Sequence, residues 1–456
     1  MKKKILGVLL TLVLAVTGFG LVGCGGGSNP APGPGPGPVV PEVSYDDDTT
    51  PVPIDETGLL FDLWTTEEME EDGWENISDY NQACVYAVTE EVVDLVIPAY
   101  VTDGENTYRV TWVSNLLFTI DNIDDYRDTG VFTGVNEFAL GVKTITIPST
   151  VEEIYSEAFV GSYTDDETNE DVLCFMENLE QIIFNNRTTQ ISGLIDVVFN
   201  LFENPNFPYY QNLVDKIFAD KLNMSVEELY ETVYNEEPTE ALLEMYEQSR
   251  TEAFEPFFTC DNDLYYLGNP GNPYMMLVRA GETYFPGEEL DEGEELIAVI
   301  NDNCKIILDY AFDGNVITGV VLPSGLVEVG DHAFWGSNIS EIIIPDTVER
   351  IGQNSFNGCE NADTLYLSSQ ITDINLMFYF SGCGFDIVYI NNADFGTYLG
   401  TILNDGATVY VLKEIFDNNE DILTANNGFA RLEVDGYEEY NGNTYVAFSY
   451  YEPPML

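Results

Sequence analysis

The sequence predicts a repeat solenoid, a β-rich fold of short stacked units, interrupted by one helical insertion. A Phe-x-Gly phrase recurs at a nearly constant spacing, at Phe312, Phe334, Phe356 and Phe380. An apolar strand phrase ending in proline, Ile342-Ile343-Ile344-Pro345, stands at a fixed phase of the same period. A unit of this size cannot bury its own apolar face, so neighbouring units must stack into an elongated, exposed array.

Residues 1–23 predict a lipoprotein signal peptide. Three lysines follow Met1, and the apolar run that comes next is too short to span a bilayer. The stretch Leu21-Val22-Gly23-Cys24 resembles a bacterial lipobox, which implies acylation of Cys24 and cleavage before it. The alternative is an ordinary signal peptide with a chance cysteine. On the first interpretation acyl chains on Cys24 hold an extracytoplasmic protein to the cell membrane.

Residues 24–57 predict a Gly/Pro-rich tether. The sequence GGGS at 25–28 is followed by proline alternating with alanine or glycine over 30–38 and by the acidic run Asp46-Asp47-Asp48. Such a composition forms no packed core and gives an extended, partly stiff segment. We expect it to hold the folded part away from the membrane.

Residues 58–190 predict an N-terminal cap followed by repeat units. Strand patterns cover 59–63, 84–88 and 93–98, and a hairpin is expected from 99–102 to 107–110 around Asp103-Gly104. These strands would close the N-terminal end of the stack. Looser repeat units follow at 143–159, with insertions near 119–130 and 162–175.

Residues 191–257 predict the helical insertion, because the repeat pattern is lost there and helical spacing replaces it. Ser225 and Glu228 match a capping box, and Leu229 follows at the start of an apolar stripe. Pro238 suits the first turn of a further helix that carries an apolar face. That face consists of Leu242, Met245 and Tyr246.

Repeat units return over residues 258–412, and residues 413–456 predict a C-terminal cap. The cap reads as a hairpin that turns at Asn441-Gly442. Within the repeats, the phrases Ile-x-x-Ile-x-Ile-Pro, Val-x-x-Ile-Gly and Ala-Phe-x-Gly-Cys recur. A different run, 264–280, interrupts them with the sequence LYYLGNPGNPYMMLVRA.

These phrases resemble the BspA-like leucine-rich repeats of bacterial surface proteins. The resemblance covers roughly residues 90–186 and 261–412, and it is stronger in the second block. The run 264–280 resembles an interruption often found inside that family. The resemblance implies a right-handed leucine-rich-repeat solenoid, surface display and adhesion to host or bacterial partners. It implies no catalytic residues.

The strongly acidic composition limits the classes of partner. The chain has 80 acidic and 15 basic residues and a formal net charge of -65. Such a field repels nucleic acid, so we expect no nucleic-acid partner, and it attracts cations. The acidic runs at Asp165 and Asp417 lack the glycine and the bidentate acid that an EF-hand loop needs. We expect no cofactor and no dedicated metal site, only weak binding of divalent cations; the alternative is that the charge serves solubility alone.

The residues that carry common enzyme chemistry are scarce. The single histidine, His332, directly precedes a repeat phrase, so a zinc site of several imidazoles is impossible and a catalytic triad has no support. No phosphate loop or dinucleotide fingerprint is present. The cysteines after Cys24 match no metal or disulfide framework, and we favour buried free thiols over bridges. These are Cys84, Cys174, Cys260, Cys304, Cys359 and Cys383.

Strand alternation predicts which side chains of the repeat sheet face outward. Ile342 and Ile344 must fill the stack, so Glu341 and Ile343 point out. The same phase in neighbouring units gives one outward column of Val321, Ile343, Tyr366, Tyr389 and Tyr410 and a second of Gly319, Glu341, Thr364 and Ile387. The first column is the candidate ligand-binding face, because tyrosine offers a large contact area with a polar tip. The alternative is that these side chains only stabilise one another across strands.

The favoured function is a lipid-anchored, monomeric cell-surface protein that performs no chemistry. It would bind a host or bacterial surface protein or glycan through its repeat face. One alternative is a surface hydrolase or enzyme accessory that acts on polysaccharide, with a carboxylate pair and the helical insertion forming its site. The other alternative is a purely structural envelope protein.

Overall fold

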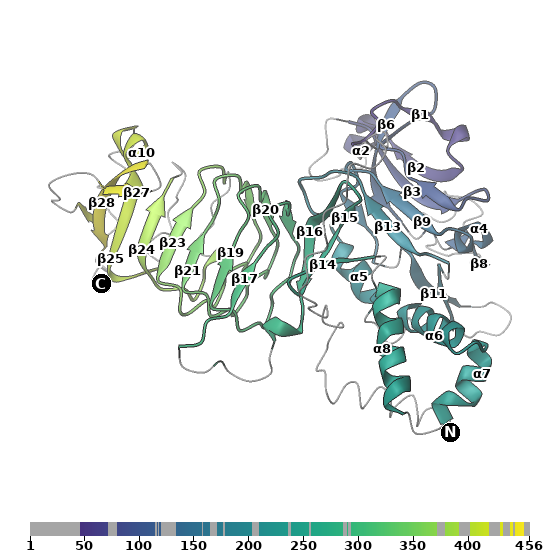
Figure 1. Ribbon diagram of the computed structural model, residues 1–456. Helices are drawn as coiled ribbons and strands as arrows, with labels where there is room; N and C mark the ends of the chain where they lie inside the picture. The colour runs from purple at the N-terminus through teal and green to yellow at the C-terminus, as the bar shows by residue number, and fades with distance from the viewer. Residues whose placement is uncertain are drawn as a thin grey trace, which may run out of the picture. The chain divides into compact units, whose positions relative to one another are not determined.

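The structure, a computed structural model, describes residues 46–450 with gaps. The longer gaps are 72–79, 120–133, 165–170, 203–208, 236–238, 286–289, 372–378, 392–401, 419–428 and 432–437, and shorter gaps occur at 115, 117, 157, 177, 255–256, 291–292 and 441–442. The described chain divides into two compact units (Figure 1). The first holds the described residues up to Thr259 together with Leu267–Pro273, and the second holds Cys260–Tyr266 and the residues from Tyr274.

A mixed sheet forms the N-terminal part of the first unit. Its order is β1 (Val52–Pro53), β5 (Tyr100–Thr102), β6 (Thr107–Val113), β3 (Gln82–Val88) and β2 (Leu59–Trp64), with β10 (Glu153–Ile154) also beside β6. Two short helices, η1 (Ile54–Glu56) and α2 (Thr66–Glu71), flank β2 in the sequence. Every residue of β3 is buried, which makes it the core strand. The predicted hairpin is confirmed: β5 and β6 are antiparallel, and the Asp103 carboxylate accepts hydrogen bonds from two backbone N–H groups of the turn.

The folded part begins before the predicted end of the tether. Asp47 Oδ1 accepts a hydrogen bond from the Asn185 amide at 2.8 Å, and Asp47 Oδ2 accepts one from the Ser149 hydroxyl at 2.5 Å. Shortly after Asp47, β1 pairs with β5 in parallel. The acidic run therefore docks onto the folded unit, because carboxylate oxygens satisfy donors in turns that lie far away in the sequence.

Three parallel strands of the first unit follow the repeat pattern. The order is β13 (Gln181–Phe184), β9 (Thr144–Ile147) and β4 (Asp94–Val96). Leu95, Ile145 and Ile182 share one register position and are buried. Other elements separate these strands along the sequence. The pair β7 (Phe118–Thr119) and β8 (Gly134–Val135) and the helix α4 (Glu137–Leu140) come between β4 and β9. The antiparallel pair β11 (Val160–Thr164) and β12 (Asp171–Phe175) comes between β9 and β13. The insertion predicted near 162–175 is thus a β-hairpin.

The predicted insertion is helical. Its helices are α5 (Leu194–Phe202), α6 (Tyr209–Lys221), α7 (Val226–Glu231), η2 (Val233–Asn235) and α8 (Glu240–Phe254). The Ser225–Glu228 capping box is formed on both sides. Leu229 is fully buried in the cluster that joins α6, α7 and α8, and Tyr246 packs into the same cluster with the partly buried Leu242 and Met245. Pro238 lies outside the described residues.

The second unit is built on two parallel ladders. One ladder runs in parallel through β16 (Asn272–Ala280), β18 (Ile306–Ile307), β20 (Glu328–Val329) and β22 (Arg350–Ile351). The strands β14 (Thr259–Asp261) and β15 (Leu264–Asn269) precede β16 in the same sheet, and Thr259 and Leu267–Pro273 of these three strands count with the first unit. The other ladder contains β17 (Ile297–Val299), β19 (Gly319–Val321), β21 (Glu341–Ile343), β23 (Thr364–Leu367), β24 (Phe385–Ile390) and β25 (Leu403–Leu412). Backbone hydrogen bonds from Ser340 N to Thr318 O and from Asp363 N to Ser340 O continue this ladder from coil to coil. A further short helix, η3 (Glu282–Tyr284), follows β16.

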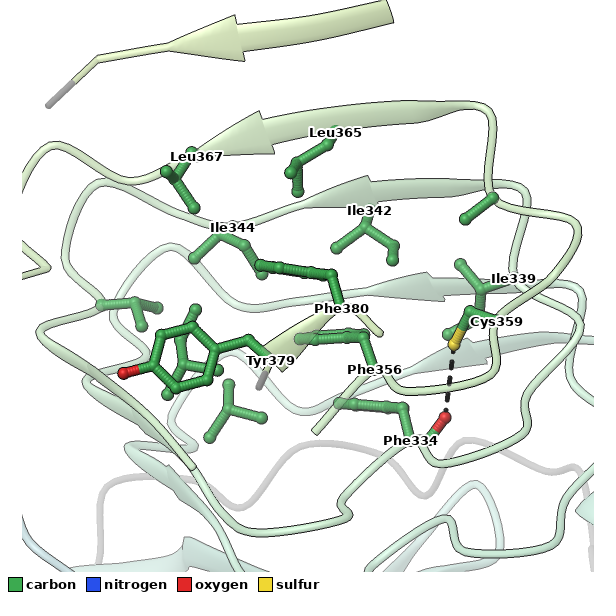
Figure 2. Packing of buried hydrophobic residues seen from close by; sticks show 14 of the residues in the cluster. Phe334, Ile339, Ile342, Ile344, Phe356, Cys359, Leu365, Leu367, Tyr379 and Phe380 are labelled. Carbon is green, nitrogen blue, oxygen red and sulfur yellow. Dashed lines mark hydrogen bonds between the residues drawn. The ribbon is translucent and has the colours of Figure 1, made fainter. Parts of the chain in front are cut away.

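Stacked phenylalanines fill the space between the two ladders. Phe312, Phe334, Phe356 and Phe380 are fully buried, and successive rings lie 5.0, 5.0 and 5.5 Å apart, nearly parallel. Figure 2 shows three of these rings one above another, beside Ile342 of β21 and the two buried leucines of β23, Leu365 and Leu367. The glycine of each phrase has a positive φ, between 70° and 82°, which explains why the phrase requires glycine.

The C-terminal strands extend the second ladder. Beyond β25 and the helix α10 (Lys413–Asn418), β28 (Asn443–Tyr450) pairs antiparallel with β25, and both β26 (Phe429–Arg431) and β27 (Glu438–Tyr440) pair with β28. Tyr440 pairs with Asn443, which confirms the antiparallel strands of the predicted hairpin, whereas its predicted turn at Asn441-Gly442 lies outside the described residues. The parallel ladder therefore ends in an antiparallel cap.

Candidate functional site

The strand registers confirm the predicted outward columns over β21, β23, β24 and β25. Ile343 pairs with Tyr366, Tyr366 with Tyr389, and Tyr389 with Tyr410. In the other column Glu341 pairs with Thr364, and Thr364 with Ile387. The buried isoleucines between them fix this phase, because a shift by one residue would exchange the two faces.

The two ends of the first column differ in exposure. Val321 is 51% exposed and Ile343 is 39% exposed. Tyr389 and Tyr410 are half-buried, and Tyr366 is buried with only 5% of its surface exposed. The prediction of a column that is open over its whole length is therefore wrong at Tyr366.

The C-terminal cap accounts for part of this burial. Because β28 adds to β25, Tyr445 falls on the tyrosine side of the sheet, where its ring lies 5.3 Å from that of Tyr389 in an edge-on arrangement. The Tyr445 hydroxyl donates a hydrogen bond to Asn391 Oδ1 at 2.6 Å, and Tyr389 and Tyr410 stack at 4.8 Å. Burial raises the pKa of Tyr445 above the ordinary tyrosine value. At this end the tyrosines pack against one another, as the alternative interpretation expects.

Two exposed residues extend the columns at their other end. Ile297 pairs with Gly319 and Val299 with Val321, and both Ile297 and Val299 are 49% exposed. Ile387, in the second column, is 36% exposed. The predicted columns stopped one unit short of Ile297 and Val299. The signal that locates them is the alternation Leu296-Ile297-Ala298-Val299-Ile300, one repeat period before the next strand.

The five aliphatic residues Ile297, Val299, Val321, Ile343 and Ile387 are called the exposed strip below. The strip follows strands β17, β19, β21 and β24, which Figure 1 draws in one row with β23 between the last two. Soluble proteins usually keep large contiguous apolar surfaces covered, and branched aliphatic side chains offer contact area without hydrogen-bonding groups. The strip is therefore a surface that an apolar partner can cover.

Four of the predicted free thiols are confirmed. Cys84, Cys304, Cys359 and Cys383 are free and buried. The Cys359 thiol donates a hydrogen bond to Phe334 O at 3.4 Å (Figure 2). The prediction is wrong for Cys260, which is disulfide-bonded. The error is understandable, because two strands that the sequence separates by any distance can meet in the fold, and spacing alone does not reveal such a pair.

Cys24 lies outside the described residues, so its acylation stays a prediction. Within the residues that the structure describes, no group of three or more potential metal ligands is found. No helix in that same part of the chain is long and apolar enough to cross a membrane. His332 is half-buried in the turn before Phe334.

Comparisons with known proteins agree with the repeat pattern. A family model described as a BspA type leucine rich repeat region matches residues 296–400 with six copies. No curated protein sequence matches the chain.

Solved structures of bacterial leucine-rich-repeat proteins are similar to the chain at low identity. A leucine-rich repeat protein from Bacteroides capillosus is 19% identical, covers 29% of this chain and 96% of its own, and has a TM-score of 0.24. A leucine rich cell surface protein from Faecalibacterium prausnitzii is 14% identical over 69% of each chain, with a TM-score of 0.19. The pneumococcal vaccine antigen PcpA is 13% identical over 81% of this chain and 96% of its own, with a TM-score of 0.25.

The fold assignment rests on the matched repeats and on the strand registers. Within residues 296–400, strands that recur at a nearly constant interval pair in parallel, and the phenylalanine rings stack between two ladders. Residues 296–400 are therefore a region of BspA-type leucine-rich repeats, and this part of the chain has the leucine-rich-repeat fold.

Proposed function

We propose that this protein is a lipid-anchored bacterial surface protein that binds another protein through the exposed strip. The single observation that carries the proposal is the exposure of Val299 and Val321, which pair in register, and of Ile343 at the equivalent position of the next strand. Side chains at equivalent positions of neighbouring parallel strands are about 4.8 Å apart. The column therefore presents a continuous apolar row along the repeats.

A protein partner fits the strip better than a glycan does. The strip residues carry no donor or acceptor on their side chains, whereas a sugar needs hydrogen bonds to its hydroxyl groups. Apolar area at the centre of a protein interface gives about 25 cal/mol for each Å² removed from water. The polar tips that would suit a glycan belong to tyrosines, and Tyr366 is buried.

The proposal is tested by measuring binding to immobilised protein panels and to a glycan array. The double variant Val321→Ser/Ile343→Ser should weaken binding to a protein partner by about tenfold or more, because two apolar contacts become polar. Val96→Ser, which changes a 61% exposed valine on β4 in the first unit, is the matched control and should bind normally. Equal binding by the double variant and the wild type would contradict the proposal, as would binding to glycans alone.

The lipid anchor needs a separate experiment. In a bacterial host, Cys24→Ser should move the protein from the detergent phase of a membrane extract to the aqueous phase, because a thioether-linked lipid can no longer form. Cys304→Ser is a control because Cys304 is free and buried. If Cys24→Ser stays in the detergent phase, the protein is held to the membrane by some other means.

Nothing in the part of the chain that the structure describes specifically favours the hydrolase alternative. It required the helical insertion to present an acid to the substrate. The Asp215 carboxylate on α6 is instead fully buried and accepts hydrogen bonds from the hydroxyls of Tyr230 and Tyr234 and from the Gln211 amide. Burial raises the pKa of both tyrosines, so they remain neutral donors. This carboxylate holds helices together and is not open to a substrate.

A further inference from the structure

The turn that follows each strand of the first ladder, after β18, β20 and β22, holds a residue with a side chain in the left-handed backbone conformation. In three successive coils this position holds Tyr310, His332 and Asn354, with φ of 60°, 54° and 55°. Asparagine and histidine adopt this conformation more readily than other residues with side chains, whereas a bulky tyrosine rarely does. Tyr310 is nevertheless 50% exposed, so core packing does not require its ring.

Three positions further along, each coil presents a second side chain on the same turn. Backbone hydrogen bonds of 3.0 to 3.1 Å join Asp313 N to Tyr310 O, Trp335 N to His332 O, and Asn357 N to Asn354 O. Stacking of the coils then sets the six side chains in two columns. We name them the aromatic–acidic patch: Tyr310, Asp313, His332, Trp335, Asn354 and Asn357.

The rings of the patch are held in a fixed arrangement. Tyr310 stacks on His332 with a centroid distance of 5.0 Å and an interplanar angle of 8°. His332 meets Trp335 edge-on at 5.6 Å, and the Asn354 amide nitrogen lies 3.2 Å from His332 Nε2. Trp335 is 46% exposed. Because the buried phenylalanines already fill the core of these coils, the outer rings are available for contact with a partner.

Carboxylates border these rings. Asp313 and Trp335 occupy equivalent positions of adjacent coils, each directly after a stacked phenylalanine. The Asp309 and Asp331 carboxylates lie in the same turns and accept hydrogen bonds of 2.6 Å from the backbone N–H of the next coil. Partial burial raises the pKa of Asp313, and nearby His332 acts in the opposite direction. Aromatic faces beside carboxylates, on a chain with a net charge of -65, favour a cation.

We propose that the aromatic–acidic patch binds arginine side chains of a partner protein. A guanidinium would stack on the indole of Trp335 and pair with the carboxylate of Asp313. Arginine fits better than lysine because its planar group stacks on a ring and forms a paired hydrogen bond with a carboxylate at the same time. The patch shares no residue with the exposed strip, so this proposal holds whether or not the strip binds a protein.

The probe is a fluorescein-labelled peptide of alternating glycine and arginine, titrated against the purified full chain at about 150 mM salt, where distant charges are largely screened. Peptides with lysine or with neutral citrulline replace arginine in parallel titrations. Trp335→Leu removes the ring but keeps apolar bulk, and it should raise the Kd about threefold. Asp313→Asn should have a similar effect. Lysine should bind more weakly than arginine, and citrulline should not bind.

Two controls separate the patch from the general charge of the protein. Asp302→Asn removes an exposed carboxylate of the same unit and should leave the Kd unchanged, and Trp335→Phe keeps a ring and should stay within about twofold of wild type. Thermal unfolding checks that each variant folds. If Trp335→Leu does not fold, the proposal is tested by comparing the Kd of Asp313→Asn with that of Asp302→Asn. Equal effects of those two variants would overturn the proposal. So would an unchanged Kd in a folded Trp335→Leu, or binding of cellohexaose in place of the peptide, which would make the patch a glycan site.

Discussion

The two units build parallel ladders of the same kind from very different spacings. In the first unit Asp94 pairs with Thr144, and in the second Glu341 pairs with Thr364 after less than half that separation along the chain. The inward residues are nevertheless equally buried, as Ile145 in the first and Ile342 in the second show. The ladder therefore depends on the apolar alternation within each strand and not on the length of the segment that connects one strand to the next.

The physical reason is that loop length and strand register affect different contributions to the free energy of folding: loop-closure entropy and the burial of apolar side chains. Doubling a loop adds only about 0.6 kcal/mol of closure entropy, so hairpins and helices can be inserted between strands at small cost. A register slip of one residue would expose every inward side chain, which costs far more. The nearly constant spacing in the second unit is accompanied by a further feature, the run of four stacked phenylalanine rings.

The largest expected effect is on this phenylalanine stack. Phe334→Ala removes a fully buried ring that stacks on both neighbours, so the free energy of unfolding of the second unit should fall by about 3 to 5 kcal/mol. Denaturant unfolding followed by circular dichroism measures the change. Ile343→Ala, at an exposed position of the same repeat, should change the free energy by less than about 0.5 kcal/mol. Similar losses in both variants would mean that the stack is not the main source of stability.

A smaller effect is expected at the glycine that follows the last strand of the first ladder. A Cβ on Gly352 would lie 2.3 Å from Asp331 Oδ1 and 2.4 Å from Asp331 N, so Gly352→Ala must displace the backbone of the preceding coil. We expect a loss of about 1 to 3 kcal/mol in the unfolding free energy. Gly319→Ala is the matched control, because its nearest neighbour would be a side-chain carbon at 3.5 Å. If both variants unfold at the same denaturant concentration, close coil packing does not explain this glycine.

The smallest effect concerns the acidic segment that docks onto the first unit. Asp47→Ala removes the acceptor for Ser149 and Asn185 and leaves their donors without this partner. The first unit should lose about 1 to 2 kcal/mol of unfolding free energy, while the second unit should be unaffected. Limited proteolysis near the start of this segment should also become faster. Asp55→Ala, an exposed residue of η1, serves as the control. Equal stability of Asp47→Ala and wild type would show that the docked segment does not support the fold.

Local patterns allowed much of the fold to be predicted. The period of the Phe-x-Gly phrase, the alternation around Ile343 and the turn at Asp103-Gly104 each report an interaction between residues close in sequence or one unit apart. The capping box at Ser225 is another local signal, confirmed on both of its sides. For the candidate site, the registers were predictable because burial of alternate residues leaves only one phase open.

The exposure of the site could not be predicted in the same way. Tyr366 and Ile343 stand at equivalent positions, but the first is buried and the second is exposed. The difference arises near the C-terminal cap, where Tyr445 enters the tyrosine cluster from β28, a strand that follows β25 only after α10, β26 and β27. The bridge at Cys260 was missed for a related reason, since cysteine spacing carries no information on which strands meet.

The sequence by itself determined the repeat period, the inward phase of each strand, the helical character of residues 191–257 and the large negative charge. These follow from propensity, periodicity and composition, which act over short distances along the chain. Only the tertiary structure decided where Asp47 docks, which part of the outward column stays open, and that Tyr310, His332 and Trp335 share a surface with Asp313. Each of these depends on the stacking of coils and on strands joined late in the chain, and that packing sets burial and ring contacts that no local pattern contains.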